Sequence, residues 1–68
     1  QLPKLLAAAA NERLSAELRI GALGAIGQVG TDDAVIKKGV ADLQNTKDKA
    51  VAERATMALQ LLNRPKQP

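Results

Sequence analysis

The chain has 68 residues, no aromatic residue, no cysteine and no histidine, and its formal charge is +3. A chain this short forms one domain that buries only about 60% of the surface its unfolded form exposes, which leaves little room for a deep substrate pocket. The missing cysteine and histidine exclude disulfides, thiolate chemistry, imidazole bases and the two commonest zinc ligands. We therefore expect no enzyme, no cofactor and no metal site.

The charge balance gives no footprint for nucleic acid or for a membrane. Two of the cations, Arg64 and Lys66, lie in the tail NRPKQP, which leaves +1 for the rest of the chain. The longest uncharged run, Ile20 to Thr31, is too short and too glycine-rich to span a bilayer, which takes about 20 apolar residues. We expect a soluble chain. Because it begins with Gln1 and lacks a signal-peptide pattern, we also expect a segment of a longer protein.

The first half of the chain has the apolar periodicity of two helices. The first is predicted over 2–10, with Pro3 in the first turn, where its missing N–H costs nothing. The second is predicted from Ser15 or the next residue to Val29, because Ser15 is a natural N-cap. Gly30 then ends this helix as a left-handed stop.

The second half repeats this arrangement. The third helix is predicted to begin at Thr31 or Asp32, where carboxylates favour a helix start, and to end near Asn45. The fourth is predicted to begin within 46–48 and to run to about Asn63. No segment shows sustained period-two alternation, so the predicted fold class is all-α.

Each predicted helix has an apolar stripe that we expect to be buried. The stripes consist of Leu2, Leu6 and Ala9; of Leu14, Leu18, Ala22, Ala25, Ile26 and Val29; of Val35, Ile36, Gly39, Val40 and Leu43; and of Val51, Ala55, Ala58, Leu59 and Leu62.

An offset of 33 residues aligns the chain with itself. The eight aligned pairs, four of them identical and four aliphatic, are Leu2 with Val35, Lys4 with Lys37, Ala8 with Ala41, Leu18 with Val51, Ala22 with Ala55, Ala25 with Ala58, Ile26 with Leu59 and Val29 with Leu62. The repeat predicts two helical hairpins. We expect one domain over 1–63, made of units 2–30 and 31–63, followed by a tail or linker over 64–68.

The stretch ELRIGALGAIGQVGTDDAV resembles the HEAT-repeat family, in particular the HEAT-like repeats of the phycobilisome-lyase type. The family pattern is roughly V-R-x-x-A-x-x-A-L-G-x-I-G-D-x-x-A-V, and the stretch DKAVAERATMALQLL repeats it more loosely. The resemblance implies an α-solenoid in which two antiparallel hairpins stack. In the family, a turn aspartate and a helix arginine often link adjacent repeats. Arg19 is in place here, whereas Thr31 replaces the aspartate and Ala52 the second arginine.

Four glycines recur at every third position of the second helix and its end. A phosphate-binding loop would need a lysine and a hydroxyl residue after the last glycine, and Gly30 is followed by TDD. We expect Gly21 to allow close approach of a neighbouring helix. The resemblance implies that Gly27 lets the turn into the next helix pass closely. Gly24 has no evident role and costs about 1 kcal/mol relative to alanine.

The remaining polar groups have capping or solvent-facing roles in this interpretation. Asp32 and Asp33 are adjacent, so their side chains would diverge by about 100° around a helix, which does not suit a metal site or an acid-base pair. We therefore interpret them as helix-capping residues. Without histidine, Ser15 is a cap rather than a nucleophile. The lysines are expected on solvated faces; their alternative role is contact with phosphate or an acidic partner. They are Lys37, Lys38, Lys47 and Lys49.

We expect a non-catalytic module for protein-protein interaction or scaffolding, a segment of a larger HEAT-repeat protein. Its partners would be another protein or neighbouring repeats of the same chain. Two units fall short of the roughly three that stable arrays need, which favours tethering or homo-oligomerisation. Two alternatives stay open: a packing segment of a larger lyase-like or other enzyme, and a weak nucleic-acid or other anionic-partner binder that uses the four lysines. The candidate partner-binding residues, chosen off the apolar stripes, are Arg13, Glu17, Arg54, Met57 and Gln60.

Overall fold

The computed structural model describes residues 2–64, and these residues form four α-helices and no strand. The helices are α1 (Leu2–Ala10), α2 (Ala16–Val29), α3 (Ala34–Leu43) and α4 (Lys49–Leu62). The predicted all-α class is thus confirmed. The predicted tail falls on residues 64–68, of which 65–68 lie outside the described residues.

Side-chain caps set the starts of three helices. The Ser15 hydroxyl accepts a hydrogen bond from the Leu18 N–H at 3.3 Å, as predicted. A carboxylate caps each of the other two: Asp33 accepts from the Val35 N–H at 2.8 Å, and Asp48 accepts from the Ala50 N–H at 3.0 Å. Each cap satisfies a backbone donor that the first helical turn leaves without an internal partner.

The third helix is shorter than predicted at both ends. It begins at Ala34, because the Thr31 hydroxyl accepts from the Asp33 N–H at 3.0 Å and holds the preceding residues in a turn. It ends at Leu43, where the Gln44 N–H bonds to the Ala41 carbonyl in a tighter i to i+3 pattern. Of the two adjacent aspartates, Asp33 is therefore the N-cap.

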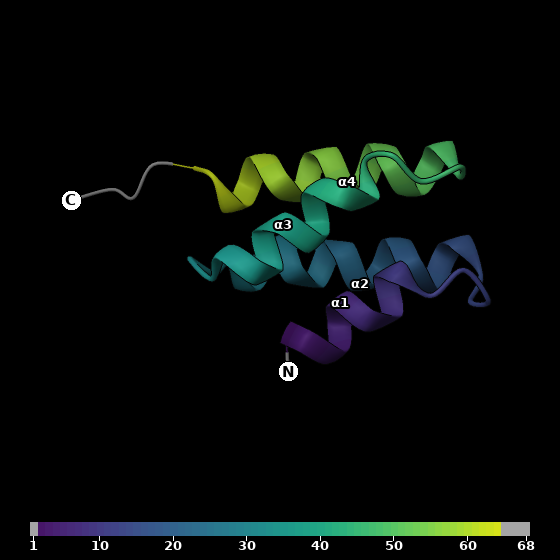
Figure 1. The fold of residues 1–68 in the computed structure, drawn as a ribbon, viewed down its shortest axis with the longest axis horizontal. Coiled ribbons are helices and arrows are strands. Elements are labelled where there is room, and N and C mark those ends of the chain that lie inside the picture. Colours follow the sequence, from purple (N-terminus) through teal and green to yellow (C-terminus); the bar gives the residue numbers. More distant parts are fainter. Residues whose placement is uncertain (1, 65–68) are drawn as a thin grey trace.

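The helices form two antiparallel pairs that pack together (Figure 1). Within the pairs, α1 packs against α2 and α3 against α4; between them, α2 packs against α4 and α1 against α3. The long helices α2 and α4 lie side by side and run in the same direction (Figure 1). The buried hydrophobic core between the helices consists of Ala9, Ala22, Leu23, Ile26, Ile36, Val40, Leu43, Val51, Ala55, Ala58 and Leu62.

Three residues predicted to be buried are exposed instead. Leu18 is 60% exposed, Val29 67% and Val35 75%. Leu18 and Val29 are exposed because α2 is turned about its own axis relative to the predicted orientation. The side of α2 that packs against α4 carries Leu23, which is fully buried and was not part of the predicted stripe. The charged residue Arg19 is also buried, at 5% exposure. The remaining members of the predicted α2 stripe divide between half-buried (Leu14, Ala25) and buried (Ala22, Ile26) positions.

The glycines of α2 differ from one another in their surroundings. The expectation for Gly21 is wrong, because a Cβ there would have no atom within 4 Å and no helix approaches closely. Gly27 is a site of close approach, but to α4: its Cβ would lie 3.0 Å from Leu61 Cδ1 and 3.4 Å from Ala58 Cα. Gly30 has φ 75° and ψ 153°, so its φ is positive as expected, whereas its ψ is extended rather than left-handed helical.

Candidate partner-binding groove

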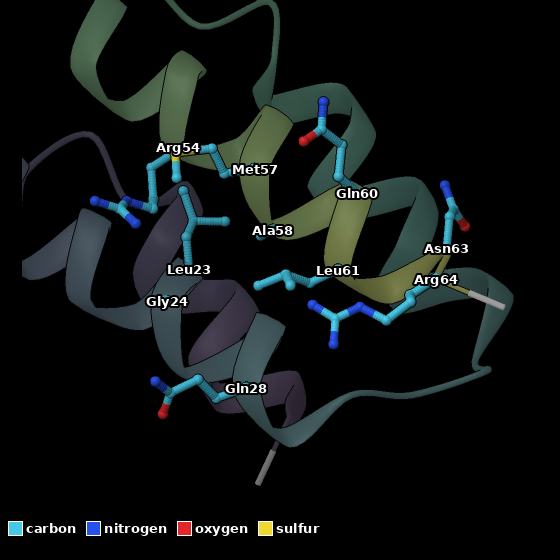
Figure 2. A pocket seen from close by; sticks show the side chains of 10 residues that line it. All are labelled: Leu23, Gly24, Gln28, Arg54, Met57, Ala58, Gln60, Leu61, Asn63 and Arg64. Atoms are coloured by element: carbon cyan, nitrogen blue, oxygen red, sulfur yellow. The ribbon is translucent and has the colours of Figure 1, made fainter. Parts of the chain in front are cut away.

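A groove of about 690 Å³ runs between α2 and α4 (Figure 2). Its size lies within the range of about 300–1,000 Å³ that is usual for binding sites. Both helices supply its lining, which consists of Leu23, Gly24 and Gln28 from α2; Arg54, Met57, Ala58, Gln60 and Leu61 from α4; and Asn63 and Arg64 just beyond α4.

The apolar part of the lining follows from how closely the two helices approach each other. Gly27 has no side chain to separate α2 from Ala58 of α4, so the helices are close where the groove forms. Met57 and Leu61 stay partly exposed there, at 50% and 41%. One turn earlier than Gly27, Gly24 lines the groove, and a Cβ on it would meet nothing within 4 Å. The missing side chain at Gly24 therefore keeps this space open, which explains a glycine that the sequence left without a role.

The polar part of the lining is cationic. Arg54 and Arg64 contribute two guanidinium groups, the other polar lining residues are the amides Gln28, Gln60 and Asn63, and no residue among 2–64 adds a carboxylate to the lining. Figure 2 shows Arg54 and Met57 near Leu23 at one end of the groove, and Arg64 beside Leu61 at the other. The groove thus combines an apolar floor with a positive charge at each end.

The structure brings together three of the five predicted partner-binding residues. Arg54, Met57 and Gln60 line the groove, whereas Arg13 and Glu17 are exposed elsewhere, before α2 and in its first turn. Sequence reasoning missed the α2 side of the groove altogether. It also missed Leu61 and Asn63, although both lie off the predicted α4 stripe and so met the criterion used for the other three.

The other candidate groups do not form a site. Lys38, Lys47 and Lys49 are exposed and Lys37 is half-buried, and none of the four lines the groove. Among residues 2–64, no three histidine, cysteine, aspartate or glutamate side chains gather in a way that could hold a metal ion. None of the helices formed by these residues has the length and apolar character needed to cross a membrane.

Comparison with known proteins gives no match: no family model describes the chain, and none of the curated proteins or solved structures is similar to it. The features of the chain that bear on its function are the repeat, the packing of the helices and the groove.

Proposed function

We propose that this chain is a non-catalytic scaffolding segment of a HEAT-like α-solenoid, which stacks with a further helical unit and presents a surface for a protein partner. The observation that carries the proposal is the 33-residue repeat in the structure itself. Adding 33 to the bounds of α2, 16 and 29, gives the bounds of α4, 49 and 62. The N-caps, Ser15 and Asp48, obey the same offset.

The repeat identifies the face of each long helix on which the preceding unit would pack. Ala58 marks the side of α4 that faces α2, because it lies against Gly27. At 100° per residue, Val51 and Leu62 lie within about 40° of Ala58 around α4. Both are buried, with exposures of 0% and 6%. The first unit thus covers this face of the second.

The equivalent face of α2 is also apolar, but no part of the described chain packs over it. Val51 and Leu62 correspond to Leu18 and Val29, which are mostly exposed, and Ala58 corresponds to the half-buried Ala25. These positions lie about 120° to 180° around α2 from Leu23 and Gly27, which are on the side where α4 packs. A surface that is buried in one unit and exposed in the other supports stacking of a further unit on α2.

The face of α4 that is equivalent to the α4-facing side of α2, and that would end the stack, is polar. The position of α4 that corresponds to Leu23 is Thr56, whose hydroxyl accepts a hydrogen bond from Gln44 Nε2 at 3.0 Å. Polar outer faces are typical of the terminal units of repeat proteins. The contrast supports extension of the stack on the α2 side and not on the α4 side.

A tandem chain tests this proposal. A second copy of residues 1–33 is placed before the full 68-residue chain, so that the 33-residue register continues. If the added unit stacks, the melting temperature rises by about 5 °C or more, because apolar surface is buried without a new fold. Amide exchange then slows around Leu18 and Val29 of the original unit. The matched control is the same tandem with Leu18→Glu and Val29→Glu in the original unit, which should melt like the single chain.

Two results would contradict the stacking: an added unit that stays unfolded, or an equal rise in the control tandem. A packing segment of a larger enzyme is the second candidate, and the exposed face of α2 favours it equally. Such a segment would stack but would have no use for the groove between α2 and α4. Binding in the groove therefore separates the two candidates.

A further inference from the structure

We propose that the groove between α2 and α4 binds a short acidic peptide segment that carries aliphatic side chains between its acidic residues. This inference rests on the proposed function, since it names the class of partner that the interaction surface takes. Its occupant follows from charge complementarity: the lining has guanidinium groups at both ends, and the described part of the chain supplies no carboxylate to it.

The spacing of the two arginines sets the length of the segment. Arg54 lies in α4 and Arg64 lies two residues beyond its end; the eight positions from Arg54 to Leu62 alone cover about 12 Å along the helix axis. An extended peptide covers that distance in about four or five residues. Carboxylates at the two ends of such a segment would face the two guanidinium groups, which bind carboxylates with two parallel hydrogen bonds.

The apolar residues of the groove determine which side chains suit the middle of the peptide, between its two charged ends. Leu23, Met57 and Leu61 provide aliphatic and thioether surface, and Gly24 leaves room above α2. The methionine side chain is flexible and adapts to branched partners. A leucine side chain in the middle of the peptide that faces the groove would therefore fill it and bury the exposed parts of Met57 and Leu61.

The same lining argues against single-stranded nucleic acid as the occupant. Proteins that bind single strands stack bases on aromatic side chains, and this chain has none. They also follow the phosphate backbone with a row of cations, whereas the four lysines singled out in the sequence lie outside the groove. An acidic, aliphatic peptide matches both the charges and the floor.

The test uses the full 68-residue chain, labelled with nitrogen-15, and the hexapeptide Glu-Asp-Leu-Leu-Asp-Glu, acetylated at its N-terminus and amidated at its C-terminus like its uncharged analogue. We expect amide shifts concentrated at Gly24, Gln28, Met57 and Leu61 with peptide at up to about 1 mM, and weaker binding as salt is added. The uncharged analogue Gln-Asn-Leu-Leu-Asn-Gln and the double variant with Arg54→Gln and Arg64→Gln should each raise Kd about tenfold.

A variant that fills the groove separates binding from folding. Gly24→Leu places a side chain in open space and should abolish peptide binding while the helix content stays unchanged. The matched control is Gly21→Leu in the same helix, which also enters open space but lies outside the groove and should bind normally.

Three results would overturn the proposal. They are the absence of amide shifts at the groove residues, equal affinity for the charged and uncharged peptides, and a higher affinity for a single-stranded hexanucleotide than for the acidic peptide. None of these readouts depends on the tandem chain. If the tandem chain is stabilised but the peptide does not bind, the stacking proposal stands and the proposal of peptide binding in the groove is wrong. The reverse result would leave a peptide-binding domain that does not stack.

Discussion

The Arg19 guanidinium of α2 donates a hydrogen bond from Nη2 to the Thr46 hydroxyl in the connection between α3 and α4, at 3.3 Å. Its Nε donates to the Ala9 carbonyl near the end of α1, at 2.8 Å. One buried side chain thus satisfies a carbonyl at the end of the first short helix and reaches the second helix pair. In the HEAT-like repeats that the sequence resembles, an arginine at this position often bonds to a turn aspartate; Thr31 replaces that aspartate here, and Arg19 bonds to Thr46.

Replacing Arg19 with methionine should lower the free energy of unfolding by about 1–3 kcal/mol. The change keeps most of the buried volume but leaves the Ala9 carbonyl without its donor. Thr46→Val should cost less, about 0.5–1.5 kcal/mol, since only the longer of the two bonds is lost. Urea unfolding followed by circular dichroism measures both. Arg13→Met is the control, because Arg13 is exposed, and a loss as large as that of Arg19→Met would show that burial of Arg19 is not the cause.

Gly24→Ala should raise the free energy of unfolding by about 1 kcal/mol. Alanine is that much more favourable than glycine inside a helix, and its Cβ would meet nothing within 4 Å. Gly27→Ala should gain less, because Leu61 Cδ1 lies 3.0 Å from the new Cβ and has to move. Thermal melts of the two variants side by side measure the difference. An equal gain at both positions would contradict the close packing of α2 on α4.

The short helices α1 and α3 should show coupling between Gly39 and Leu6. A Cβ on Gly39 would lie 2.5 Å from Leu6 Cδ2 and 3.2 Å from Leu6 Cγ, so Gly39→Ala should cost about 1–3 kcal/mol. Leu6→Ala removes these atoms, and the double variant should therefore be more stable than the two single losses predict, by about 0.5–3 kcal/mol. A double-mutant cycle in urea measures this coupling. Strict additivity would mean that α1 and α3 separate freely.

Much of the fold could be predicted because its signals are local. Ser15, Asp33 and Asp48 cap their helices through bonds to residues two or three positions away, and Pro3 and Gly30 mark boundaries without long-range contacts. The 33-residue repeat then ordered the helices into two pairs. The bounds of α3 moved by a few residues, where threonine and aspartate formed a turn in place of a first helical turn, and α4 begins at Lys49, just after the predicted 46–48.

The rotation of α2 could not be predicted from periodicity, because this helix is apolar on most of its circumference. Leu18, Leu23 and Val29 are equally good core residues by type, and only the position of α4 decides that Leu23 is the one covered. The groove depends on the same pairing, since residues 23–28 and 54–64 meet only in three dimensions. For this reason the sequence could select Arg54 but could not separate it from Arg13.

Equivalent residues of α2 and α4 differ in their exposure, and this difference gives the sharpest prediction about the 68-residue chain on its own. Leu18 and Val51 occupy equivalent repeat positions with exposures of 60% and 0%. Leu18→Glu should change the free energy of unfolding by no more than about 0.5 kcal/mol, because the new carboxylate stays in water. Val51→Glu should unfold the chain, because a charge would lose its hydration in the core at a cost of several kcal/mol in a domain this small.

Circular dichroism at 25 °C, followed by a thermal melt, separates the two variants. Val51→Ala is the control for lost volume and should keep the helical spectrum with a lower melting temperature, since it removes apolar contact without adding a charge. If Leu18→Glu unfolds the single chain as Val51→Glu does, then the outer face of α2 is already covered in solution, and self-association of the chain becomes the explanation. Sedimentation of the unmodified protein would then show a dimer, with its α2 faces occupied by each other and closed to a further unit.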